Sequence, residues 1–74
     1  IKNMEKVKCY ICGTEFDRDE YYDDCPYCDW TYLGFENELD ENEYEEINTM
    51  TIAQAKANFA QGKDIWGEPL KEKP

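Results

Sequence analysis

"CYICGTEFDRDEYYDDCPYCDW", residues 9–30, contains every cysteine of the 74-residue chain: Cys9, Cys12, Cys25 and Cys28. The cysteines form two C-x2-C pairs separated by twelve residues. Two turns of this kind can face each other and present four thiolates as a tetrahedron, the geometry that Zn2+ accepts. Gly13, directly after the first pair, permits the positive φ that such a turn requires, whereas Asp29 at the matching place tolerates it less freely. The sequence therefore predicts a four-cysteine metal site.

Four thiolates would complete the coordination sphere, so the predicted site is structural or electron-transferring and not hydrolytic. Zinc is the favoured ion. Iron stays as the alternative, because ligand softness and coordination geometry alone do not separate the two ions. Two disulfides, in any of three connectivities, are another use of four cysteines, but the chain shows no secretion signal. A thioredoxin-type redox site needs a C-x-x-C at a helix start in a βαβ unit, which this sequence lacks.

Composition narrows the function further. The chain has no histidine and no serine, which excludes Ser-His and Cys-His catalysis, and we expect neither an enzyme nor a small-molecule substrate. Eight cationic residues against 18 carboxylates give a net charge of −10 and no basic patch, so nucleic acid is not an expected partner. No apolar run approaches the roughly 18 residues that span a membrane, and a cytoplasmic protein is expected.

We predict a single domain over residues 1–74, with a metal-binding ribbon at 9–30, an acidic loop at 36–46 and a helix at 51–61. The end of residues 1–8 could pair as a short strand. The acidic stretch "ENELDENEYEE" carries seven carboxylates in eleven residues, which repel one another and favour a solvated loop. So few aliphatic residues remain that the chain needs the metal to stay folded.

The segment "TIAQAKANFAQG", residues 51–62, carries the best helix signal. Thr51 is placed to cap the first turn, Gln54 to reach back to it, and Gly62 to end the helix in a left-handed conformation. The stripe predicted to face the core is Ile52, Ala55, Phe59 and Ala60. The aromatic residues predicted to pack around the metal are Tyr10, Phe16, Tyr27, Trp30 and Phe59, with Ile65 and Trp66 as further anchors.

The motifs resemble two known families. "CPYCDW", the acidic stretch and the helix segment are similar to the cysteine-rich CPCC family, whose pattern fits all four cysteines and Trp30, and Thr51, Ala55, Asn58 and Phe59 in the helix. "VKCYICGTEFD" with "DDCPYCDW" also resembles the rubredoxin-like domain of rubrerythrins, over about residues 7–30. The first resemblance implies a fold and a bound metal. The second implies iron and single-electron transfer.

The fold class predicted from these features is a small metal-bound α+β protein, with zinc-ribbon or rubredoxin-like β-hairpins and one C-terminal α-helix. Zn2+ on Cys9, Cys12, Cys25 and Cys28 would be structural. The predicted function is a small acidic protein–protein interaction module, of the kind that inhibitors and immunity proteins represent, with a partner that carries a basic surface. The alternative function is a rubredoxin-like iron electron carrier.

Overall fold

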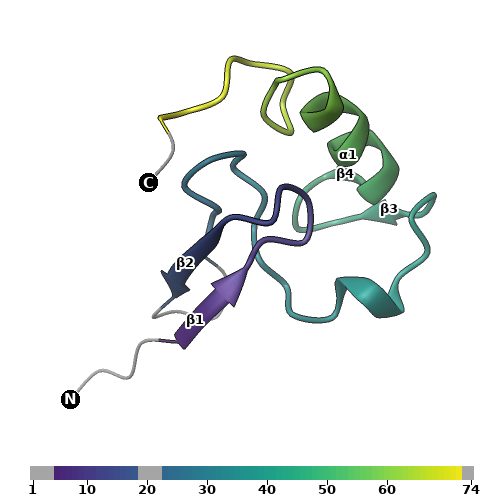
Figure 1. Ribbon diagram of the computed structural model, residues 1–74. Helices are drawn as coiled ribbons and strands as arrows, with labels where there is room; N and C mark the ends of the chain where they lie inside the picture. The colour runs from purple at the N-terminus through teal and green to yellow at the C-terminus, as the bar shows by residue number, and fades with distance from the viewer. Residues whose placement is uncertain (1–4, 19–22, 73–74) are drawn as a thin grey trace.

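Two short antiparallel hairpins and one helix make up the regular structure of the computed structural model, which describes residues 5–18 and 23–72. Strand β1 (Glu5–Lys8) pairs with β2 (Glu15–Arg18), with Val7 opposite Phe16. A 3-10 turn, η1 (Glu36–Glu38), precedes the second hairpin, in which β3 (Tyr44–Glu45) pairs with β4 (Met50–Thr51). Helix α1 (Ile52–Ala60) follows β4 directly (Figure 1). This arrangement confirms the predicted fold of β-hairpins with one helix.

Helix α1 is fixed at both ends by its own sequence. The Gln54 amide donates to Thr51 Oγ1 at 3.0 Å, and the Thr51 amide donates to Gln54 Oε1 at 2.9 Å, which completes a capping box. At the other end Gly62 takes a φ of 77° and its amide donates to the Phe59 carbonyl. The predicted helix at 51–61 is therefore present as nine helical residues with a cap on each side.

The core lies between the two hairpins and the helix. Trp30, Ile52 and Ile65 are its largest fully buried apolar side chains, and the Trp66 side chain next to them is half exposed. Of the predicted aromatic core, Phe16 and Trp30 are buried. Tyr27 and Phe59 are partly buried, pack against the core and meet edge-to-face at 6.1 Å.

Two core predictions are wrong. Tyr10 is 37% exposed, because it lies on the outer side of the first cysteine turn, where the Lys56 ammonium sits 4.9 Å above its ring. Ala60 is exposed at the end of α1, because it is turned by about 100° from Phe59 and so lies off the face on which Ile52, Ala55 and Phe59 meet the core.

The prediction of a solvated acidic loop at 36–46 is also wrong at two positions. Glu36 is only 4% exposed: its Oε2 accepts hydrogen bonds from Trp30 Nε1 and the Leu33 amide, and its Oε1 accepts one from the Gly34 amide. Glu45 is half-buried in β3 and accepts hydrogen bonds from the backbone amides of the next turn. Charge-assisted hydrogen bonds from several donors replace the hydration that a carboxylate loses on burial. The high density of negative charge in 36–46 therefore does not keep Glu36 and Glu45 in solvent.

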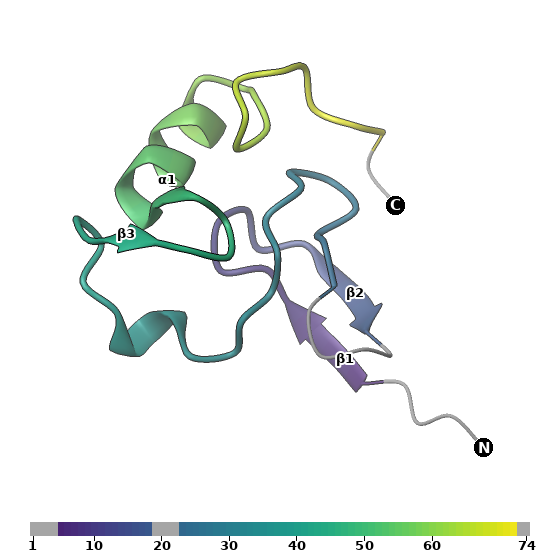
Figure 2. The same cartoon turned by 180° about the vertical axis from the view of Figure 1, so that it is seen from behind.

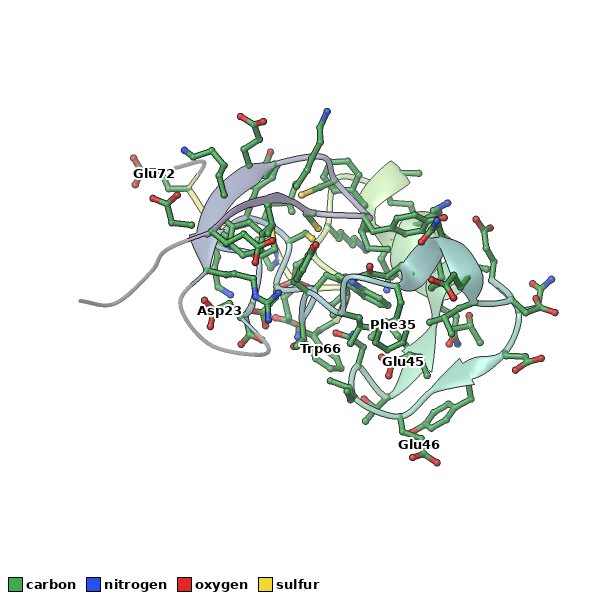
Figure 3. The ribbon with its side chains drawn as sticks, turned by 90° about the horizontal axis from the view of Figure 1, so that it is seen from below. Asp23, Phe35, Glu45, Glu46, Trp66 and Glu72 are labelled. Atoms are coloured by element: carbon green, nitrogen blue, oxygen red, sulfur yellow. The ribbon has the colours of Figure 1, made fainter. Side chains whose placement is uncertain are left out.

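The remaining carboxylates of the stretch do face water: Glu38, Asp40, Glu41, Glu43 and Glu46. Glu41 pairs with Lys56 at 2.6 Å. Figure 3 shows carboxylates pointing outward on several sides of the molecule, with Glu46 at one end of the view and Glu72 at the other. Within the described residues, no helix has both the length and the apolar character needed to cross a membrane.

Candidate metal centre

The two C-x2-C pairs fold into the same turn twice, and we call residues 9–14 the first knuckle and residues 25–30 the second. In the first, the Gly13 amide donates to the Cys9 carbonyl at 2.9 Å and the Cys9 amide donates to the Thr14 carbonyl at 2.9 Å. In the second, the same pair of bonds joins Asp29 to Cys25 at 3.0 Å and Cys25 to Trp30 at 2.8 Å. The repeat in the sequence is therefore a repeat in backbone structure.

Both knuckles need a residue in the left-handed region after the second cysteine. Gly13 has a φ of 79° and Asp29 a φ of 76°. A left-handed backbone costs glycine nothing sterically, whereas aspartate adopts it with strain. The sequence predicts this conflict at Asp29, and the second knuckle forms in spite of it.

The knuckles also direct backbone N–H groups at sulfur. The Ile11 amide donates to Cys9 Sγ and the Tyr27 amide donates to Cys25 Sγ, each at 3.4 Å. The Cys12 sulfur lies 3.2 Å from Thr14 Oγ1. The two amide donors stabilise negative charge on the Cys9 and Cys25 sulfurs, which suits thiolate ligands.

The four sulfur atoms converge on one point. All lie within 4.8 Å of one another, with Cys9–Cys28 and Cys12–Cys25 distances of 3.5 Å across the two knuckles. A tetrahedron with Zn–S bonds of about 2.3 Å has edges of about 3.8 Å, so the cluster has the right size for one ion. All four cysteines are free. The donor set and its spacing therefore fit a tetrahedral metal ion.

Burial closes the site on most sides. Cys25 and Cys28 are fully buried and Cys9 is 3% exposed, while Cys12 is half-buried. Trp30, fully buried, follows the last cysteine and forms part of the same core cluster. Within the part of the chain that the structure describes, these cysteines are the one group of three or more metal-ligating side chains that could hold an ion.

The close approach of the sulfurs shifts the pKa values of neighbouring cysteines in opposite directions when no metal is bound. Hydrogen bonds from the Cys28 and Cys9 thiols stabilise the Cys25 thiolate and lower the pKa of Cys25. The neighbouring Cys25 group raises the pKa of Cys9 to about 12 and, most strongly, raises the pKa of Cys28, with burial adding to both. A divalent cation would remove this conflict, because it attracts all four thiolates.

Two buried polar side chains, Asn48 and Asp64, hold backbone turns together and are not predicted by the motifs of the sequence. Asn48 is 1% exposed; its Oδ1 accepts from the Thr31 amide at 2.8 Å and its Nδ2 donates to the Thr31 carbonyl at 3.2 Å. Asp64 is 5% exposed, and its Oδ1 accepts from the amides of Trp66 and Glu68. The spacing D-x-x-G at Asp64 is typical of a turn and could have indicated it, whereas nothing local marks Asn48.

Fold and site together define a small protein with two cysteine knuckles that could hold one metal ion. A family model described as "Cysteine-rich CPCC" matches residues 7–63, which is most of the chain and includes both knuckles and helix α1. The chain therefore belongs to the cysteine-rich CPCC family. Neither a curated protein nor a solved structure gives a significant match.

Proposed function

We propose that Cys9, Cys12, Cys25 and Cys28 bind one Zn2+ as a structural centre, in a non-catalytic protein that binds another protein through its acidic surface. The observation that carries the metal half of this proposal is the convergence of four free sulfurs within 4.8 Å, from two knuckles of equal geometry. Four thiolates complete a tetrahedron and leave no position for substrate or water. Zinc bound there would contribute its binding energy to folding.

Iron is the alternative ion, and the N–H···S bonds to Cys9 and Cys25 favour it as much as they favour zinc. An iron centre would make the protein a one-electron carrier. A visible absorption spectrum and voltammetry on protein prepared with both ions supplied separate the two functions. A colourless, redox-silent protein supports the structural zinc centre, and thiolate-to-iron bands with a reversible wave support the carrier.

The partner half rests on charge. The net charge is −10, and five carboxylates between residues 38 and 46 are exposed, of which Glu41 is paired with a lysine. Such a surface attracts a basic partner and speeds association at low salt. The side chains available for this role are Glu38, Glu43 and Glu46, because Glu36, Asp40 and Glu45 accept hydrogen bonds from the fold and Glu41 is paired.

A matched pair of variants tests this half. E38Q/E43Q/E46Q removes three exposed charges from the acidic surface, and E5Q/E15Q/E72Q removes three exposed charges elsewhere. We expect the first variant to lose chemical cross-links to native partners at low salt, while the second variant retains them. Equal retention by both variants would show that the acidic surface is not the binding surface.

A further inference from the structure

The C-terminal residues 64–71, here called the strap, lie across the second knuckle, as the yellow segment shows in both views (Figure 1 and Figure 2). The Ile65 amide donates to the Cys28 carbonyl at 3.0 Å, and the Lys71 amide donates to the Tyr27 carbonyl at 3.3 Å. The strap is thus bonded to the backbone of one metal-ligating cysteine and of the residue before it. The family match ends at residue 63, before the strap begins.

Hydrogen bonds within the strap and to helix α1 fix the start of the strap. Asp64 forms a tight turn in which its carboxylate accepts two backbone amides and its own amide donates to the Glu68 carbonyl at 2.8 Å. Ile65 is 1% exposed within the core, and Asn58 of helix α1 donates to the Ile65 carbonyl at 2.9 Å. The helix, the turn and the knuckle therefore meet at Ile65.

Asp29 makes the side-chain connection between knuckle and strap. Its Oδ2 accepts a hydrogen bond from Trp66 Nε1 at 2.8 Å, and its Oδ1 lies 2.7 Å from the Lys71 ammonium. Asp29 is also the residue that occupies the left-handed position next to Cys28, where glycine would sit without strain. A strained residue that also makes two polar contacts indicates that the contacts offset the strain.

We infer that Asp29 is a positioning residue for the metal centre, and that it holds the strap on the second knuckle so that Cys28 releases the metal slowly. The inference rests on the proposed metal binding by the four cysteines. Opening the second knuckle moves the carbonyls of Tyr27 and Cys28, so the strap must detach before the metal leaves. The Asp29 contacts raise the barrier to that step.

Asp29→Gly separates this role from ordinary backbone preference. Glycine removes the strain at the left-handed position. Backbone preference alone therefore predicts that the variant releases the metal more slowly than the natural chain, or at the same rate. Loss of the two contacts to Asp29 predicts roughly tenfold faster release instead. Asp29→Asn tolerates the left-handed conformation and keeps an acceptor for Trp66, so its release rate should stay within about threefold of the natural chain.

The experiment measures zinc transfer from the full-length, zinc-loaded chain to an excess of a chromogenic chelator. W66F/K71M removes both strap donors without removing Ile65 from the core, and K63M is its control, since Lys63 is an exposed cation beside the strap. We expect D29G and W66F/K71M each to accelerate release, and K63M to leave it unchanged. In the W66F/K71M background, D29G should give no further acceleration.

Amide hydrogen exchange supplies a local readout. In zinc-loaded D29G, exchange of the Ile65 amide should rise because this amide donates to the Cys28 carbonyl, while the amides of the β1–β2 hairpin, which pair with each other, keep their protection. A D29G chain that releases zinc at the natural rate or more slowly, or whose effect adds fully to that of W66F/K71M, overturns the inference alone. An intact chain that binds no zinc overturns the proposed function as well.

Discussion

Replacing Glu36 tests the unexpected use of an acidic residue inside the fold. Glu36→Ala leaves two buried donors, Trp30 Nε1 and the Leu33 amide, without an acceptor, while the Gly34 amide is near enough to solvent to bind water. Each orphaned buried donor costs about 1–3 kcal/mol, so the free energy of unfolding should fall by about 3 kcal/mol. That is a large share of the roughly 5–15 kcal/mol available to a small domain.

The assay is denaturant unfolding of the metal-loaded chain at a fixed excess of metal, because the metal concentration itself changes the apparent stability. Trp30 and Trp66 together give the fluorescence signal, and of the two only the Trp30 indole loses its acceptor in this variant. Glu38→Ala removes an exposed carboxylate from the same η1 turn and should change the free energy of unfolding by less than about 0.5 kcal/mol. Glu36→Gln keeps one acceptor oxygen but places its NH2 group against a donor of the fold. Its loss of unfolding free energy should lie between those of Glu36→Ala and Glu38→Ala.

A loss of stability below about 1 kcal/mol in Glu36→Ala, or an equal loss in Glu38→Ala, would show that the Glu36 carboxylate is not a buried acceptor that stabilises the fold. The first result would mean that water replaces the carboxylate. The second result would mean that removal of any carboxylate from residues 36–46 changes the free energy of unfolding equally, as expected of a solvated acidic loop.

Three further predictions follow from the same geometry. Asn48→Ala should lower the free energy of unfolding by about 2 kcal/mol in thermal or denaturant melts, because the Thr31 amide loses its buried acceptor; an unchanged midpoint would contradict this. Thr51→Ala should cost about 1 kcal/mol and reduce helical circular dichroism, and no change would show that the capping box is dispensable. Zinc binding should release at least two protons, because the pKa values of the Cys9 and Cys28 thiols are raised, and zinc affinity should therefore fall as pH falls. Calorimetry in two buffers of different ionisation heat counts the released protons. Release of fewer than two protons would contradict the prediction.

Local patterns in the sequence predicted the parts of the fold that are stabilised locally. The helix followed from Thr51, Gln54 and Gly62, because a capping box and a left-handed end act within a few residues. The sulfur cluster followed from the doubled C-x2-C spacing, since each knuckle is closed by hydrogen bonds between residues four or five apart.

Contacts between distant residues could not be predicted in the same way. Asn48 reaches Thr31 across 17 positions and Trp66 reaches Asp29 across 37, and no local pattern encodes either pairing. Glu36 was misassigned for a related reason: charge density within a window treats every carboxylate alike, whereas a single carboxylate beside several backbone donors is stabilised by burial. Tyr10 was misassigned because aromatic character near a ligand does not say which side of the turn the ring occupies.

The proposed structural zinc centre can be checked in one experiment on the full chain. Native mass spectrometry of protein prepared with zinc and iron both supplied gives the bound ion, its stoichiometry and the oxidation state of the thiols together. We expect one zinc per chain, four deprotonated cysteines and loss of the folded charge-state distribution when the zinc is removed. A folded chain carrying iron, or carrying no metal and two disulfides, would contradict it.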